Sequence, residues 1–351
     1  MPSTIILHNA ADLTLVLGKE KQEVEVAKSA LRMVSSVWCA MFGSDWAEHK
    51  ATSIDLPEDD PHAMLIVLRI AHYQHKELPK KLTMEELVNL AVVCDKYDTV
   101  HLVRHFLDQY NWTAPNKNCT LYSSYGESLF VSWTFGNLED FQRVARDVLM
   151  NIEVDRNGAV GKGWALSHLT PSGFIENILQ VRANVIARIR LLCAELYISG
   201  SKASCGVVAP YNKPECRAMI LGSVMNILKT VGYVVVPDTE PTLALQSLKN
   251  IRLKLQVFKI YTFEELNWTL MLELYKREMA ARNTGFGQFS YKKETPDEQE
   301  SRIKSQCRTS HEACGKQVDI AEKLANIIRS IPSPVLDSHK RHIEIQAAKG
   351  V

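Results

Sequence analysis

The first forty residues carry two different periods of hydrophobic side chains. Val24 and Val26 alternate with glutamates, which is the period of a half-buried strand. Ser35-Ser36 then predicts the cap of a second short helix, because it interrupts a helical face. The apolar positions of that face recur every three or four residues and are Leu31, Val34, Val37/Trp38 and Met41/Phe42. The pattern predicts a strand that leads into two short helices.

The segments on either side of this stretch predict a small sheet and more helices. The apolar run at 5–7 and the segments 13–17 and 53–56 are typical of short strands. Pro61 suits the first turn of a helix that runs to His72. Thr83 with Glu86 forms a capping-box signature for a helix through residue 97, and a last helix is expected at 100–109. These elements predict one α/β domain over residues 1–112.

Beyond residue 112 the strand signal nearly disappears. The polar segment around Pro115 reads as a linker, and Tyr233–Val236 is the one strand-like exception. The periodicity predicts helices at 127–135, 138–152, 171–198, 214–231, 243–260, 263–282 and 296–330. We therefore expect a linker and helical extension at 113–170, a helical C-terminal domain at 171–332 and, after Pro332, a mobile tail at 333–351.

The stretch from Val26 to Phe42, with its flanks, resembles the BTB/POZ domain. The family pattern is a strand, a basic turn, a leucine, a Ser-Pro-type break and an aromatic residue followed by Met-Phe or Met-Leu. It stands here as Val26, Lys28, Leu31, Ser35-Ser36, Val37-Trp38 and Met41-Phe42. Upstream, 12–18 is similar to the opening strand of the family, and downstream 54–60 is similar to its third strand and acidic turn. The resemblance implies a BTB/POZ fold, a small sheet capped by a helical cluster, followed by an all-α region.

Two further features refine the resemblance. Residues 131–136 with 139–141 look like the helical extension that follows the BTB domain in many fungal proteins, which implies a fungal type. The usual His-Lys pair of the family is Ala27-Lys28 here, and Val34 stands where many members carry an arginine. The charged pocket of the transcription-factor members therefore keeps only Asp12, which argues against corepressor binding through that pocket.

Bulk composition gives no sign of a nucleic-acid or membrane partner. The chain has 351 residues and a formal net charge of +1, so it lacks the strong basic field of a nucleic-acid-binding protein. No apolar run is long enough to span a bilayer, and the N-terminus lacks the form of a signal peptide. The eight cysteines form no dense disulfide framework. We expect a protein of the cytosol, the nucleus or both.

One group of side chains has the spacing of a metal site. Cys307, His311 and Cys314 would share one face of a helix, and Cys205 or Cys216 could supply a fourth zinc ligand. The same cysteines also continue an apolar stripe, where a cysteine packs as a small core residue. Because the chain has no C-x-x-C pair, we favour the packing interpretation and expect neither a metal nor another cofactor.

No catalytic constellation is evident in the sequence. The loop at 158–163 lacks the first glycine and the hydroxyl residue of a phosphate-binding loop. Glu58, Asp59 and Asp60 could be paired carboxylates, but a helix N-terminus explains them as well. We therefore expect a protein that is not an enzyme.

The resemblance implies an interaction protein whose partners are proteins. In the BTB family the region of the two short helices builds the homodimer contact beside the surface used for cullin scaffolds. The candidate interaction residues in that region are Trp38, Met41, Phe42 and Trp46. The leading hypothesis is an adaptor that recruits a substrate to a cullin-type ubiquitin ligase. The alternative is a nuclear transcription or chromatin cofactor that acts through self-association of the BTB domain.

Overall fold

The structure is a computed structural model that describes residues 3–43, 46–114, 125–161, 170–205, 213–234, 242–262, 295, 297–298, 301 and 313–349. It confirms the predicted fold class, a small sheet with helices followed by further helices. The chain divides into two compact units. Unit 1 comprises residues 1–150, 160–180 and 333–351, and unit 2 comprises residues 151–159 and 181–332.

The sheet of unit 1 follows from the alternating sequence pattern. In the described residues its strands are β1 (Ile5–Ile6), β2 (Leu13–Leu17), β3 (Gln22–Val26) and β4 (Ser53–Leu56), in the spatial order β1-β3-β2-β4. Strands β2 and β3 are antiparallel, with Leu15 opposite Val24. Strand β1 runs parallel to β3, and β4 runs parallel to β2. The leucines of β2 are all buried, so this sheet face forms part of the core.

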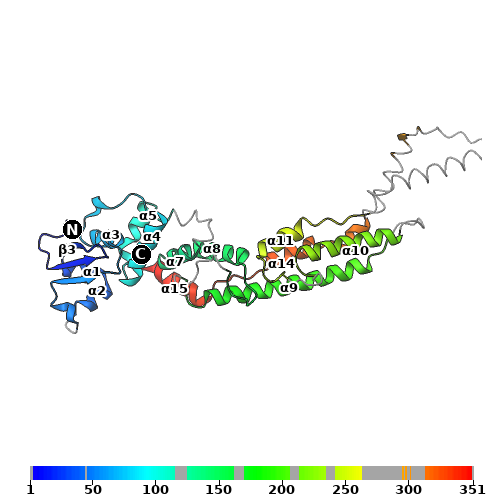
Figure 1. Ribbon diagram of the computed structural model, residues 1–351. Coiled ribbons are helices and arrows are strands. Elements are labelled where there is room, and N and C mark those ends of the chain that lie inside the picture. The colour runs from blue at the N-terminus through cyan, green and yellow to red at the C-terminus, as the bar shows by residue number, and fades with distance from the viewer. Residues whose placement is uncertain are drawn as a thin grey trace, which may run out of the picture. The chain divides into compact units, whose positions relative to one another are not determined.

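Helices cover this sheet and complete the first domain (Figure 1). They are α1 (Lys28–Val34), α2 (Ser36–Met41), η1 (Ala47–His49), α3 (Pro61–Ala71), η2 (His75–Glu77), α4 (Met84–Lys96) and α5 (Val100–Gln109). Helix α3 is apolar over most of its surface and packs against α4, α5 and α1. Its buried side chains join those of the strands and of α4 in one continuous core.

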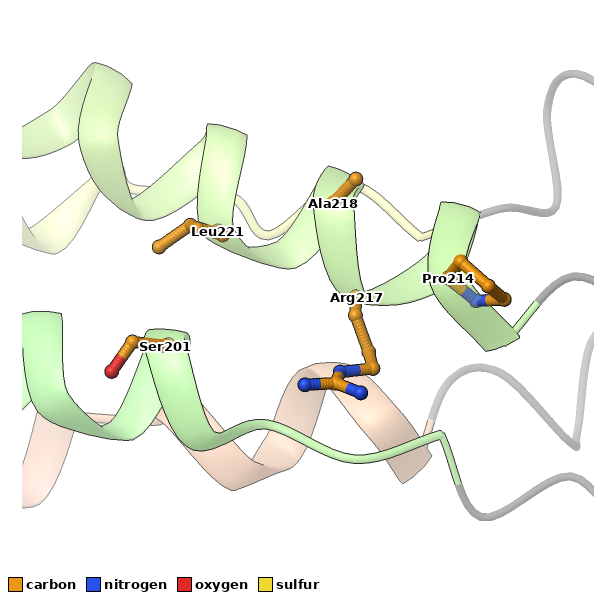
Figure 2. A pocket seen from close by; sticks show the side chains of 6 residues that line it. Ser201, Pro214, Arg217, Ala218 and Leu221 are labelled. Carbon is orange, nitrogen blue, oxygen red and sulfur yellow. The ribbon is translucent and has the colours of Figure 1, made fainter.

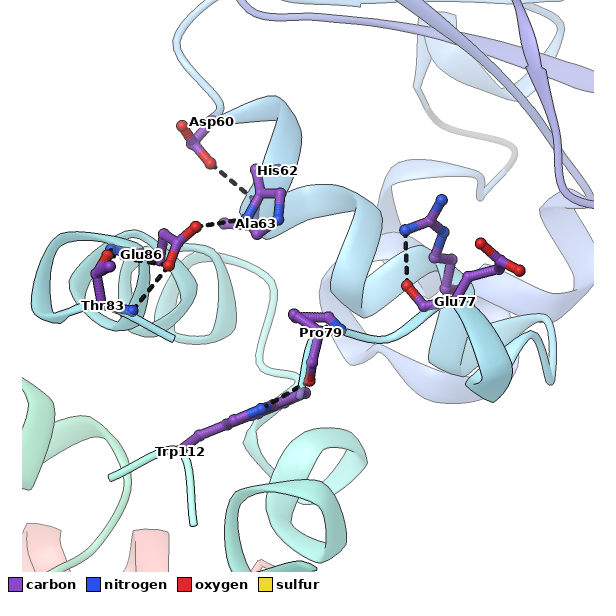
Figure 3. Close-up of polar contacts among 9 residues, drawn as sticks. Asp60, His62, Ala63, Glu77, Pro79, Thr83, Glu86 and Trp112 are labelled. Atoms are coloured by element: carbon purple, nitrogen blue, oxygen red, sulfur yellow. Dashed lines mark hydrogen bonds and ion pairs between the residues drawn. The ribbon is translucent and has the colours of Figure 1, made fainter. Parts of the chain in front are cut away.

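The starts of α3 and α4 are fixed by the side chains that the sequence predicted (Figure 3). Asp60 precedes α3, and its Oδ1 accepts from the Ala63 N–H at 2.8 Å. Thr83 and Glu86 form the predicted capping box, in which the Glu86 carboxylate accepts from the Thr83 N–H at 2.7 Å. Each carboxylate satisfies backbone donors that the first turn of a helix leaves open.

The C-terminal segment of the chain differs from its expectation. Residues 333–351 were expected as a mobile tail, but Asp337–Ala348 form helix α15, which packs against α7 (Tyr125–Thr134) within unit 1. The ring of His342 stacks on that of Trp133 with a centroid distance of 3.8 Å and an interplanar angle of 9°. Gly136 lies close to the backbone of Ala347. Helix α15 therefore packs on unit 1 through an aromatic contact and a close approach of two backbones, although few of its side chains are apolar.

Three polar contacts attach α15 and its flanks to the rest of unit 1. Lys349 Nζ lies 2.7 Å from Asp98 Oδ1 at the end of α4. Arg104 of α5 donates to the Gln346 carbonyl at 3.0 Å. His339 is 2% exposed, and its Nε2 lies 2.9 Å from the Ser172 carbonyl. The C-terminal helix therefore completes the unit that contains the first domain.

In the part of the chain that the structure describes, further helices are α8 (Leu138–Asn151), α9 (Phe174–Lys202), α10 (Lys213–Thr230), α11 (Leu248–Gln256) and α14 (Ala321–Arg329), with the short η5 (Lys316–Val318). In unit 2, α11 packs against α10 and α14. Tyr233 and Val234 are not in a strand, and α14 is preceded by a break rather than a continuous helix from 296. The helix predicted at 263–282 lies outside the described residues.

Among the helices that the structure describes, none is both long enough and apolar enough to cross a bilayer.

Candidate protein-interaction surface

The break between α1 and α2 is built by Ser35, as the sequence predicted. The Ser35 hydroxyl accepts from the Trp38 N–H at 3.0 Å and donates to the Tyr97 carbonyl at 2.6 Å. Ser36 Oγ donates to Asp98 Oδ2 at 2.8 Å. Two adjacent hydroxyls thus cap α2 and attach it to the C-terminal end of α4, which fixes how the α1–α2 region presents its side chains.

Two of the four candidate interaction residues lie in the core. Trp38 is 1% exposed, and its ring lies 4.9 Å from that of Tyr97. Phe42 is 2% exposed, and its ring belongs to the same core. Most side chains of this region are needed for the core of a small domain, so the anchors must be sought among its other candidates. Met41 is half-buried and packs against this core.

The fourth candidate is on the surface, together with one residue of the predicted apolar stripe and one that sequence reasoning did not single out. Trp46 is 61% exposed, Met33 82% and Val37 38%. We call Met33, Val37 and Trp46 the α1–α2 apolar side chains. Met33 was missed because it falls outside the apolar stripe of α1. A large apolar residue on the polar side of a short helix was the signal that could have revealed it.

The charged side of this region has a structural role. Asp12 Oδ1 accepts from the Lys28 N–H, the first of α1, at 2.7 Å. Lys28 Nζ in turn donates to the Ala51 and His49 carbonyls at 2.6 and 3.1 Å. Val34 is half-buried and packs against the core. The remaining acid of the pocket thus caps a helix, and an apolar side chain occupies the position of the family's arginine.

The acidic turn after β4 was the strongest candidate for paired carboxylates. Asp59 is buried, and it accepts from Lys96 Nζ at 2.6 Å and from the Tyr97 hydroxyl at 2.5 Å. Burial, together with the hydrogen bond to Asp59, raises the pKa of the Tyr97 phenol above its ordinary value. Since Asp60 caps α3, these two carboxylates are engaged in contacts within the fold.

The candidate metal ligands are only partly visible. Cys307 and His311 lie outside the described residues. Cys314 is buried, and its sulfur lies near those of Cys205 and Cys216, the two residues that the sequence offered as a further ligand. The expected face of Cys307, His311 and Cys314 is therefore untested, while three cysteines from distant segments come together.

Comparison with known proteins supports the fold assignment for the first domain. A search of curated proteins and a search of solved structures each returned no match. Residues 7–111 match the family described as the BTB/POZ domain. That range contains the strands β2, β3 and β4, the helices α1 to α5 and the α1–α2 apolar side chains. Residues 7–111 of this chain are therefore a BTB/POZ domain, a module of protein–protein interaction.

Proposed function

We propose that this protein is an adaptor that binds a cullin-type ubiquitin ligase scaffold through its BTB domain and holds a substrate with its helical unit. The BTB match supports an interaction role, and the exposed Trp46 is the observation that carries the proposed contact. The side chains of Met33 and Val37, from α1 and α2 of the same region, add apolar area. The resemblance associates this region with family interfaces.

An exposed tryptophan suits the role of an anchor. Tryptophan is among the residues most enriched at the energetic centres of protein interfaces, because its large ring removes much apolar surface from water. Trp38 and Phe42 cannot serve in this way without leaving the core. Trp46 precedes η1 with an extended backbone, so a smaller residue there leaves the local fold intact.

The alternative, a transcription or chromatin cofactor, has less support. Asp12 is engaged with the first N–H of α1, and Val34 offers no charge. A corepressor pocket of the family type would need an acid and an arginine together. Self-association through the α1–α2 region is compatible with either role.

The test is gel filtration with light scattering, on the full chain alone and mixed with a cullin N-terminal scaffold. We expect a co-eluting complex at micromolar concentration. Trp46→Ser should weaken it by about 30-fold, since an interface anchor contributes about 2 kcal/mol or more. Failure of the wild-type chain to form a complex at micromolar concentration would overturn the cullin proposal.

A matched pair of valines provides the control. Val37 and Val92 are 38% and 40% exposed, and both lie on helices of the BTB domain. Val37→Gln should weaken the complex and Val92→Gln should not, with both variants folded by circular dichroism. Equal losses for both variants would move the contact away from the α1–α2 region.

A further inference from the structure

Three cysteines from distant parts of the chain meet in unit 2. Cys205 follows α9, Cys216 lies in the first turns of α10, and Cys314 lies in the turn before η5. Their sulfur atoms all lie within 4.8 Å of one another, and the Sγ atoms of Cys205 and Cys314 are 4.0 Å apart. Cys216 and Cys314 are buried, whereas Cys205 is half-buried.

Contacts of other residues hold these segments in place. Gln317 donates from Nε2 to the Ser204 carbonyl at 2.8 Å and accepts from the Ser204 N–H at 3.2 Å. This pair of hydrogen bonds fixes the backbone beside Cys205 to η5, which follows Cys314. Helices α9 and α10 approach closely at Gly200, since a Cβ atom added to this glycine would lie 2.8 Å from Val224 Cγ2. The three thiols are thus positioned by the surrounding fold.

The spacing fits a shared ion better than a disulfide. In a tetrahedral zinc site with Zn–S bonds of about 2.3 Å, two sulfur atoms lie about 3.8 Å apart. A disulfide requires a sulfur–sulfur distance of about 2.05 Å. The sulfur atoms of Cys205 and Cys314 are 4.0 Å apart, which is close to the separation in a zinc site. A disulfide would require the two sulfur atoms to move about 2 Å closer.

Packing alone does not account for the grouping. Cys94 and Cys193 are buried singly in apolar cores, which is how a cysteine behaves as a small hydrophobic residue. Cys205, Cys216 and Cys314 instead place three soft donors around one point. Thiolates favour zinc and other soft or borderline ions over magnesium or calcium.

A hollow and a positively charged side chain lie beside the start of α10, the helix that carries Cys216. A hollow of about 270 Å³ opens where α9 ends and α10 begins, and Gly200 and Arg217 are among the residues that line it. Arg217 directly follows Cys216, and its guanidinium extends toward the end of α9 (Figure 2). A zinc ion with three thiolates has a net charge of −1, and Arg217 places a positive charge at the residue that follows one of the ligands.

We propose that Cys205, Cys216 and Cys314 bind one zinc ion through three thiolates, with a water molecule or another donor in the fourth position. Each thiol gives its proton to solvent as its Zn–S bond forms, so no oxidant or reductant is required. The ion would join the segment after α9, the start of α10 and the turn before η5, and so act as a structural clamp of unit 2.

The bound state should depend steeply on pH. A cysteine binds zinc as the thiolate, so each ligand must lose its proton when the ion binds. Zinc must then displace protons from all three sulfurs. The apparent affinity should fall by up to about 1,000-fold for each unit of pH decrease, the limit for three released protons.

The test uses the full chain without a polyhistidine tag, purified under reducing conditions. Elemental analysis of the wild-type chain should give about one zinc per chain. After metal removal, cobalt titration should give the thiolate charge-transfer band of a tetrahedral site. Cys205→Ser, Cys216→Ser and Cys314→Ser should each weaken cobalt binding by more than about 100-fold, because each removes a direct ligand.

Cys193→Ser is the matched control, since Cys193 is a buried cysteine of the same unit outside the cluster. It should keep the zinc content and the cobalt spectrum of the wild-type chain. Cys205→Ser is the most informative ligand variant, because the half-buried position tolerates a hydroxyl and circular dichroism can verify the fold. The proposal is overturned if wild-type chain binds cobalt no more tightly than folded Cys205→Ser. Peptide mapping that finds a disulfide within the cluster, with no metal, would also overturn it.

Discussion

The two units join distant chain segments in different ways. In unit 1, α15 and the residue after it meet the rest of the unit through ring stacking, two hydrogen bonds to backbone carbonyls and the Lys349–Asp98 ion pair. In unit 2, the turn before η5 meets the ends of α9 and α10 at three thiols. The segments of unit 1 are connected by contacts between protein groups, whereas those of unit 2 meet at three cysteines, which are the residues of a zinc site.

This difference matters for how each unit responds to its surroundings. Aromatic packing and hydrogen bonds of the kind in unit 1 do not depend on a ligand. A join that is completed by an ion gains stability only when the ion is bound, and it loses that stability with acid or a chelator. We therefore expect a chelator to lower the thermal stability of unit 2 and to leave the BTB-containing unit unchanged.

The largest effect should come from removal of α15. A chain that ends at Pro332 leaves Trp133 without His342 and removes buried His339 and Ile343. The free energy of unfolding of unit 1 should fall by at least about 4 kcal/mol, as for the loss of large buried groups. Urea unfolding followed by tryptophan fluorescence measures it. A chain that ends at Lys349 keeps α15 and should unfold like the wild type. Unchanged stability of the shorter chain would mean that α15 is dispensable.

A pair of glycines tests the same join more gently. Gly136 and Gly158 both have positive φ, of +70° and +79°. An alanine Cβ at 136 would collide with the Ala347 backbone, but one at 158 would meet nothing within 4 Å. Gly158→Ala should cost about 1 kcal/mol of strain and Gly136→Ala about 1–3 kcal/mol more. If both variants lost the same free energy of unfolding in urea, α15 would be able to move away from the new methyl group without a loss of stability.

Sequence periodicity predicted the BTB elements well but could not resolve neighbouring apolar residues. Val37 and Trp38 both fit the helical stripe, yet the structure turns Trp38 inward and leaves Val37 half outside. With two adjacent apolar positions on a short helix, only the packing partner decides which is buried. For Trp38 that partner is Tyr97, which is far away in the sequence.

Features that depend on contacts between distant residues were beyond reach of the sequence. Helix α15 buries His339 and Gln346, so its sequence lacks the apolar stripe by which a packed helix is recognised. The cysteine cluster unites residue 314 with residues 205 and 216, at no motif spacing. From the sequence, Cys205 and Cys216 were alternative candidates for one further ligand beside Cys314. The fold brings all three sulfur atoms together.

A buried and an exposed arginine of α9 differ in their expected contribution to the stability of unit 2. Arg182 is 4% exposed and donates from Nη2 to the carbonyls of Ala244 at 2.9 Å and Gln246 at 2.5 Å. Arg182→Leu should cost about 2–3 kcal/mol, because it leaves two partly buried carbonyls without their charged donor. Arg188→Leu is the control, since it removes one exposed bond to Ser330 and should cost under about 1 kcal/mol. Hydrogen exchange of α9 and α11 reports both. Equal protection in the two variants would contradict a role for the buried arginine.

The smallest effect is a pH dependence in the BTB domain. His72 accepts from the Ala27 N–H at Nε2, 3.1 Å away, and donates from Nδ1 to the Leu68 carbonyl at 2.8 Å. Burial, together with the nearby His8, lowers the pKa of His72 below its ordinary 6.5. Between the folded and unfolded pKa values the unfolded chain binds the extra proton, so stability is complete above pH 6.5 and is lost as the pH falls through the folded pKa.

His72→Gln isolates this contribution. The glutamine oxygen can accept from the Ala27 N–H, but it does not titrate, so the variant should lose less stability than the wild type as the pH falls from about 7 to about 5. Urea unfolding at several pH values measures the two slopes. Parallel curves would show that the half-buried ring takes up its proton without a loss of stability.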